Sequence, residues 1–280
     1  MSVGGDQIPN GNAGRGADET APAPEIERRD DFFVGYLGRL PAASRALIAT
    51  VVVGLVVGFL GGAWAIGASQ ADPGPAGFGR ALTLEGVIYA EPYPYLRTPP
   101  ADGFPNGRTV TLGSARGKYG VQTEASEFDG RSVEVRGPTI NRGDIVSIQV
   151  GWNGRAGAHR VTPIEADLAA RLSPVEDLGR WRIRGEICDG KCWLGAMRPG
   201  RGLAHKACAN FCVIGGSPAL FVTEAPIEGE EFLLLADSEG RTPGPELLDR
   251  VAERITLEGK VERHGDLLIF KADLATGLAR

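Results

Sequence analysis

The sequence has no excess of positive charge. Its 280 residues include 30 Lys and Arg against 35 Asp and Glu, which leaves a formal net charge of −5. A chain with this balance offers no basic field to hold nucleic acid, so we expect no nucleic-acid partner. The sequence also lacks a Gly-rich phosphate loop and the motifs G-x-S-x-G and H-E-x-x-H. These absences favour a binding protein over an enzyme.

One long stretch lacks charge altogether. No charged residue occurs between Arg45 and Asp72, and residues 46–68, ALIATVVVGLVVGFLGGAWAIGA, are apolar almost throughout. About 20 such residues suffice to cross the hydrocarbon core of a membrane as a helix. A buried core helix is usually shorter and keeps a polar edge, and the apolar region of a signal peptide is also shorter. We therefore predict a single transmembrane helix over residues 46–68.

The basic residues around this span predict its orientation. Four arginines lie just before it, and the first basic residue after it is Arg80. The positive-inside rule then places residues 1–45 in the cytoplasm and residues 69–280 on the outer side of the cytoplasmic membrane. The four arginines are Arg28, Arg29, Arg39 and Arg45.

Glycines recur every four residues within the span, at Gly54, Gly58 and Gly62. They share one helix face, which lets a second helix approach closely. The pattern is typical of packing against a partner membrane protein, and it is also compatible with the ordinary tolerance of membrane helices for glycine.

The rest of the chain divides by composition. Residues 1–31 are polar and rich in Gly, Pro and acidic residues, which predicts a disordered cytoplasmic tail. Residues 32–45 form a juxtamembrane segment, and residues 69–80 form a Gly/Pro/Ala linker. The 41 Gly and 19 Pro of the whole chain favour short strands and many turns over long helices.

An internal repeat organises residues 81–280. The segment SVEVRGPTINRGDIVSIQV (132–150) aligns without a gap with RITLEGKVERHGDLLIFKA (254–272). Each copy reads as a strand, a tight Gly-Asp turn and a second strand, which is a hairpin signature. An earlier pair aligns LTLEGVIYAEPYPYL (82–96) with RIRGEICDGKCWL (182–194). The matched glycines are Gly86 with Gly185, Gly137 with Gly259 and Gly143 with Gly265.

Two copies of a strand-rich unit ending in a hairpin predict two small five-stranded barrels of OB-like type. We place the first at residues 81–165 and the second at 181–280, with a linker at 166–180. Gly185 and Gly259 lie further apart than Gly86 and Gly137, so the second copy contains additional residues. A loop added to a scaffold is where function usually resides.

That loop, residues 188–212, holds all four cysteines of the chain. Residues 203–213, LAHKACANFCV, lie between Gly/Pro-rich segments and predict a short helix. On a helix, His205, Cys208 and Cys212 share one face. With Cys192 from the preceding strand or loop they would form a tetrahedral Cys₃His site of the kind that zinc prefers. Met197 and the thiolates would also suit copper, and Cys188 is a possible further ligand.

Two alternatives remain open for the cysteines. A domain outside the cytoplasm faces an oxidising space, where structural disulfides persist. Cys208 and Cys212 are also compatible with a redox-active pair whose pKa is lowered by His205, as in a periplasmic thiol–disulfide oxidoreductase. His264, in contrast, falls in the second hairpin turn, where we expect it to be exposed to solvent.

The run K-C-x-x-G-x-M-x-P-G-x-G-x-x-H-x-x-C-A-x-x-C, from Lys191 to Cys212, covers about a tenth of the chain. It resembles a motif of uncharacterised bacterial membrane-anchored proteins. The resemblance implies that the cluster acts as a unit and that Cys188, which departs from the motif, is a spare thiol. No activity follows from it. The chain also resembles exported OB-like haem chaperones in combining an anchor with a barrel, but their His-x-x-x-Tyr motif is absent, so we do not expect haem attachment. The matching residues are Cys192, Met197, Pro199, His205, Cys208 and Cys212.

The sequence thus predicts a mainly β protein with one transmembrane helix and two OB-like barrels, the second carrying a Cys/His loop. The predicted function is a membrane-anchored, extracytoplasmic binding or accessory subunit that holds zinc or copper. Its predicted partners are the lipid membrane and a membrane electron-transfer or cofactor-assembly complex.

Overall fold

The computed structural model describes residues 42–69, 76–115, 117–143, 145–151, 160–198 and 200–274. The chain forms two compact units, Met1–Ser69 and Gln70–Arg280, which are described separately. The predicted disordered tail, most of the predicted juxtamembrane segment and half of the 69–80 linker lie outside the described residues.

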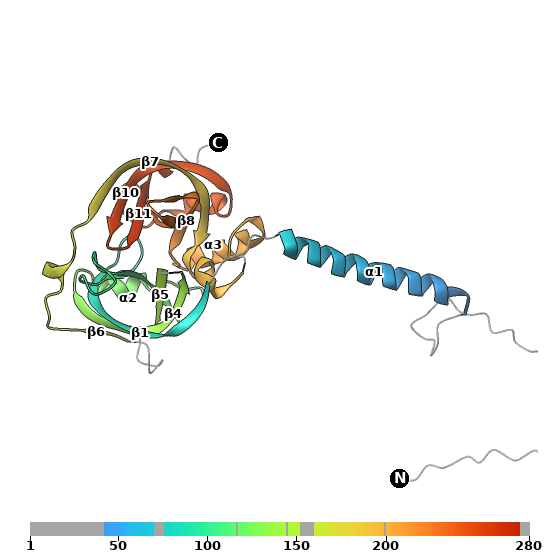
Figure 1. Cartoon of the computed structure of the whole chain (residues 1–280), viewed down its shortest axis with the longest axis horizontal. Coiled ribbons are helices and arrows are strands. Elements are labelled where there is room, and N and C mark those ends of the chain that lie inside the picture. Colours follow the sequence, from blue (N-terminus) through green and yellow to red (C-terminus); the bar gives the residue numbers. More distant parts are fainter. Residues whose placement is uncertain are drawn as a thin grey trace, which may run out of the picture. The chain divides into compact units, whose positions relative to one another are not determined.

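In the first unit, the residues that the structure describes form one helix, α1 (Ala42–Ser69), of 28 residues (Figure 1). At 1.5 Å per residue it is about 42 Å long, more than the roughly 30 Å of a hydrocarbon core. Its mean hydropathy reaches 2.4 over 18 residues, and no part of that window is buried. By length and composition α1 can cross a membrane. Gly54, Gly58 and Gly62 are exposed, so a helix that packs on them stays a prediction.

The second unit consists of two closed five-stranded barrels. In the first barrel the strands run in the order β1-β2-β3-β5-β4, and β4 pairs back with β1; β6 adds to the free part of β4. Residues 76–80, predicted as linker, belong to β1. The elements are β1 (Ala76–Tyr89), β2 (Tyr95–Arg97), β3 (Thr109–Ser114), α2 (Gln122–Ser126), β4 (Ser132–Arg142), β5 (Ile145–Val150) and β6 (Arg160–Pro163).

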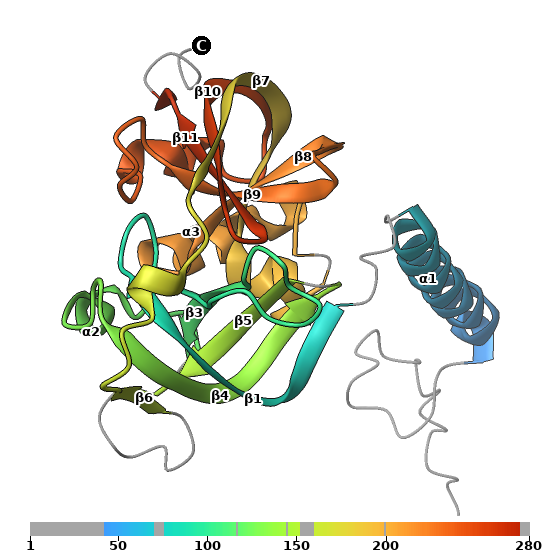
Figure 2. The ribbon, with the colours of Figure 1, turned by 60° about the vertical axis from the view of Figure 1, so that its left-hand side comes forward.

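The second barrel repeats this order as β7-β8-β9-β11-β10, closed between β10 and β7. Residues 176–180, predicted as linker, begin its first strand. Figure 2 shows the two barrels next to each other, with α3 between them. The elements are β7 (Glu176–Asp189), α3 (Lys206–Ile214), β8 (Ala219–Ile227), β9 (Glu230–Ala236), β10 (Arg254–His264) and β11 (Leu267–Ala272), with short helical turns at Ala169–Arg171, Cys192–Ala196, Leu203–His205 and Pro245–Arg250.

Each barrel has its own apolar interior, built by alternation along the strands. In β4, for example, Val133 and Val135 point inward and their neighbours outward. The first interior includes Ile88, Leu112 and Ile148. The larger second one contains Ile187, Phe221, Leu234, Val261 and Phe270 among others.

The predicted repeat matches the strand pairing of the structure. β4 and β10 have 11 residues each, β5 and β11 have 6 each, and both hairpin turns contain a glycine with positive φ. The other matched glycines also have equivalent surroundings, because a Cβ at any of them would collide with a carbonyl of the adjoining strand. The colliding carbonyls belong to Arg97 for Gly86, Gln149 for Gly137, Val222 for Gly185 and Lys271 for Gly259.

The tip of each hairpin reaches the other barrel. Arg142, at the end of β4, places its guanidinium carbon 3.7 Å from the centre of the Trp193 ring. His264, at the end of β10, lies edge-on to Tyr95 and its Nδ1 is 3.2 Å from the tyrosine hydroxyl. The expectation that His264 is solvent-exposed is therefore wrong: its side chain is only 12% exposed, because the turn packs against the first barrel.

Candidate metal centre

The two barrels differ most between their first two strands. Residues 90–94 connect β1 to β2, whereas residues 190–218 connect β7 to β8. The additional residues of the second copy therefore lie in this connection, as predicted, and they include three of the four cysteines. Its turn Leu203–His205 and the helix α3 together cover the segment that was predicted to be helical.

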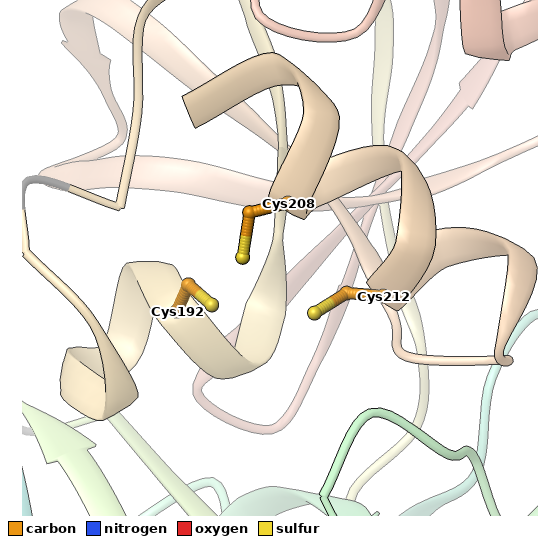
Figure 3. Close-up of side chains that lie close together, drawn as sticks. All are labelled: Cys192, Cys208 and Cys212. Carbon is orange, nitrogen blue, oxygen red and sulfur yellow. The ribbon is translucent and has the colours of Figure 1, made fainter. Parts of the chain in front are cut away.

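Three cysteine sulfurs meet in this connection. The Sγ atoms of Cys192, Cys208 and Cys212 all lie within 4.8 Å of one another (Figure 3). Cys192 belongs to the helical turn after β7, while the other two lie four residues apart on one face of α3. Cys192 and Cys212 are buried, and Cys208 is half-buried. The three thiols are thus prearranged around one point that is open on the Cys208 side.

Asp189 fixes the first of these cysteines. Its Oδ1 accepts a hydrogen bond from the backbone N–H of Cys192 at 2.8 Å, and its Oδ2 lies 3.0 Å from His205 Nε2. Asp189 has no exposed surface, and His205 is 5% exposed. Buried carboxylates are expensive unless they are hydrogen-bonded, so these two contacts orient the whole group.

His205 is close to the cysteines but is grouped differently from them. It forms a second set of neighbouring ligand atoms with Asp189 and Cys192, again within 4.8 Å of one another. The four predicted ligands therefore fall into two overlapping groups that share Cys192. In the geometry of the structure, His205 faces Asp189, so the Cys₃His set remains a prediction while the three-sulfur group is observed.

The first barrel contributes a cation to the cluster. Lys118, in the loop after β3, donates a hydrogen bond from Nζ to Cys208 Sγ at 2.8 Å, which raises the pKa of the lysine. Met197 Sδ lies 3.4 Å from the same sulfur, and the Met197 residue is 46% exposed. Cys208 is therefore contacted by an ammonium group and a thioether at the open side of the cluster.

The loop that carries Lys118 is held in place by tight backbone contacts. The N–H of Gly120 donates to the carbonyl of Gly215 at 2.6 Å, and a Cβ on either glycine would collide with backbone. Lys191, directly before Cys192, donates to the carbonyls of Ser114 and Gly117. These hydrogen bonds connect the two barrels next to the three cysteine sulfurs.

The thiols of Cys192 and Cys212 have pKa values shifted in opposite directions. Cys192 and Cys212 are hydrogen-bonded, which lowers the pKa of Cys212 and raises that of Cys192, and Lys118 further lowers the pKa of Cys212. A cation that bonds to all three sulfurs would replace their thiol protons.

Cys188 lies apart from this group. Its thiol is buried and donates to Glu186 Oε1 at 3.2 Å, and burial raises its pKa well above the usual range. All four cysteines are free, so the structure contains no disulfide among them. Cys188 is thus separated from the sulfur cluster in the way that a spare thiol would be.

The sequence did not identify two participants. Asp189 follows Cys188 directly, and an acidic residue beside a Cys/His run was a usable signal for an orienting group. Lys118 carried no signal, because only the docking of the first barrel brings it to Cys208. No protein-family model, curated protein or solved structure matches this chain.

Proposed function

We propose that this protein is a membrane-anchored metal-binding protein, which α1 fixes in the cytoplasmic membrane and whose second barrel binds a zinc or copper ion. The observation that carries the proposal is the convergence of the sulfurs of Cys192, Cys208 and Cys212. Three thiols within 4.8 Å, two of them buried, are a set of soft ligands around one point.

The choice of metal depends on the fourth ligand. Copper(I) accepts thiolate and thioether sulfur, and Met197 lies beside Cys208 on the open side. Zinc strongly prefers four ligands, and in its case the nitrogen of His205 or a carboxylate oxygen of Asp189 would complete the set. In either case Asp189 orients Cys192 through its backbone N–H.

The membrane part of the proposal comes from the sequence. The basic residues before α1 support a cytoplasmic N-terminus, with both barrels outside. The shared strand order of the barrels supports an OB-like identity for each. We further propose a non-enzymatic accessory role, in which the glycine face of α1 packs against a partner in an electron-transfer or cofactor-assembly complex.

Elemental analysis of the full chain, purified in detergent, tests the metal site. We expect about one zinc or copper ion per chain, lost in Cys208→Ser and retained in Cys188→Ser. The second variant is the matched control, because it removes a buried thiol that lies outside the cluster. Equal loss of metal in both variants, or no stoichiometric metal in the wild type after reconstitution under reducing conditions, would refute the proposal.

The rival function is thiol–disulfide exchange. The closeness of Cys208 and Cys212 favours it, since both sulfurs belong to the same cluster. In that case the protein would contain no metal, and two thiols would disappear on mild oxidation and return on reduction. Thiol counting on the same samples distinguishes the two functions.

A further inference from the structure

A large cavity lies between the two barrels. Its volume is about 950 Å³, within the usual range of small-molecule sites. The first barrel contributes the loop around Phe104 and, from its β4–β5 hairpin, Arg142, Gly143 and Ile145. The second barrel contributes Trp193 and Arg201 from the Cys/His connection, together with the β8–β9 hairpin.

One wall of this cavity carries concentrated positive charge. The guanidinium carbon of Arg142 lies 3.7 Å from the centre of the Trp193 ring, and that of Arg201 lies 5.8 Å from it. Arg142 also donates to the carbonyl oxygen of Trp193 at 3.1 Å. Within the part of the chain that the structure describes, neither arginine forms an ion pair with a carboxylate.

The electrostatic surroundings of Arg142 reinforce this point. Burial lowers its pKa most, the nearby Arg201 and Arg198 lower it further, and Glu231 raises it without reaching ion-pair distance. Half-buried guanidinium groups that repel one another are poorly compensated by a single aromatic ring. An anion from solution would supply the missing partner, in a bidentate geometry if it is a carboxylate or a phosphate.

Four carboxylates also line the cavity, those of Glu224, Glu230, Glu231 and Asp266. Asp266 Oδ1 accepts the backbone N–H of Thr109, and Glu231 acts on Arg142 from beyond ion-pair distance. Glu224 pairs with Arg184 and Arg254, and Arg263 pairs with Glu176 and Glu228. Apolar side chains also line the cavity, among them Phe104, Ile145 and Phe232. The cavity therefore combines two arginines beside Trp193, which have no ion-pair partner among the residues that the structure describes, with several apolar side chains.

We infer that the cavity between the barrels binds a small organic anion, with a carboxylate or phosphate head on Arg142 and Arg201 and an apolar or planar body along Ile145 and Phe232. The site lies beyond the proposed metal centre and does not depend on it. The two are neighbours in the chain, because Trp193 directly follows Cys192.

Calorimetric titration of the full chain in detergent tests this inference with three probes: benzoate, phenyl phosphate and inorganic phosphate. We expect saturable binding of at least one phenyl compound below about 10 mM, and at least tenfold weaker binding of inorganic phosphate, which has no apolar body. Comparison of the two phenyl probes then shows which head group the arginines prefer.

Variants locate the binding. Arg201→Gln should weaken the preferred probe at least tenfold, and Arg142→Gln should do the same, because each removes a charge-assisted hydrogen bond to the head group. Arg201→Gln is the cleaner test, since the structure assigns its guanidinium no hydrogen bond whose loss would loosen the fold. Arg182→Gln is the control, because this exposed arginine pairs with Glu258 outside the cavity. No saturable binding of any probe, or binding unchanged in Arg201→Gln, would overturn the inference.

Discussion

The two barrels share a strand order but differ in what was inserted into them. Both close through the same pairing, both have matched glycines under the neighbouring strand, and both end in hairpins of equal length. The first connects its opening strands through residues 90–94, whereas the second does so through residues 190–218. The scaffold is thus common to both copies, while the cysteine cluster belongs to the much longer connection of the second copy.

The tips of the two hairpins also differ between the barrels. Arg142 and His264 are equivalent positions, and each packs on an aromatic ring of the other barrel. The first tip supplies a permanent charge to the cavity beside Trp193. The second supplies a titratable ring, held between Tyr95 and Glu262. Equivalent positions have therefore acquired different chemistry at a shared interface.

The largest expected effect comes from the shared scaffold. Gly137→Ala and Gly259→Ala should each lower the free energy of unfolding by about 3 kcal/mol or more, because the added Cβ collides with a strand carbonyl that cannot move alone. Denaturant unfolding of the full chain in detergent measures both. Gly77→Ala is the control within β1: its Cβ would meet no atom within 4 Å, so a change of only about 0.5 kcal/mol is expected. A tolerated Gly259→Ala beside a damaging Gly137→Ala would break the equivalence of the barrels.

The strands of the two barrels were the part of the molecule that could be predicted from the sequence. Strand periodicity and the glycine spacing aligned the sequences of the two hairpins residue by residue, because both reflect local geometry that a small closed barrel must satisfy. The start of each barrel was not predictable in the same way. The Gly-rich residues 76–80 and the polar residues 176–180 look like parts of linkers, yet they extend β1 and β7 by pairing with β4 and β10. Such pairing is a tertiary effect that composition does not reveal.

A second prediction concerns His264, at the tip of the second hairpin, and the pH dependence of stability. Burial lowers the pKa of His264 to about 4, with Arg97 and Lys271 adding to that effect and Glu262 opposing it. In the unfolded chain the pKa is about 6.5, so between these values the unfolded state binds the proton and the folded state does not. The stability should therefore be complete above pH 6.5 and should fall by up to about 3 kcal/mol as the pH drops to 4.

Chemical unfolding between pH 7 and pH 4 measures this loss, and His264→Gln isolates it. The variant should show a smaller decrease over the window, because it has no ring to protonate in the unfolded state. The equivalent Arg142→Gln should keep the full decrease, since arginine does not titrate there. Parallel pH profiles for wild type and His264→Gln would contradict the assignment.

Metal should stabilise one barrel more than the other. A free ion at 100 times its dissociation constant adds about 2.7 kcal/mol to the stability of the state that binds it. Hydrogen exchange of the full chain, with and without zinc or copper(I), should show slower exchange in residues 190–218 and little change in residues 90–94. Equal protection of both connections would indicate that the ion acts on the scaffold rather than on the sulfur cluster.

The candidate site was predictable in kind but not in arrangement. The spacing of Cys208 and Cys212 on α3, and the supply of Cys192 from the preceding turn, followed from helix periodicity and position. The role of His205 did not, because a buried carboxylate, Asp189, lies within hydrogen-bonding distance of its ring. Lys118 is 90 positions from Cys208 in the sequence, and no local pattern could have linked them.

The smallest expected effect concerns the support of the metal ligands. Asp189→Asn should weaken metal binding about tenfold, because second-shell groups that orient ligands typically contribute tenfold to a hundredfold in affinity. The variant keeps an oxygen for the N–H of Cys192 but loses the charge that faces His205. Competition with a chromophoric chelator on the full chain measures the affinity.

The first barrel provides a matched control for this change. Asp129 Oδ1 accepts the backbone N–H of Ala90 at 2.9 Å, so it supports the connection after β1 much as Asp189 supports the one after β7. Asp129→Asn should leave metal affinity unchanged, because the connection that it supports, residues 90–94, contains no cysteine. If both variants weakened binding equally, the carboxylates would act through the stability of the barrels. A loss confined to Asp189→Asn would instead show that a support of this kind became a part of the metal site only in the barrel that gained the cysteines.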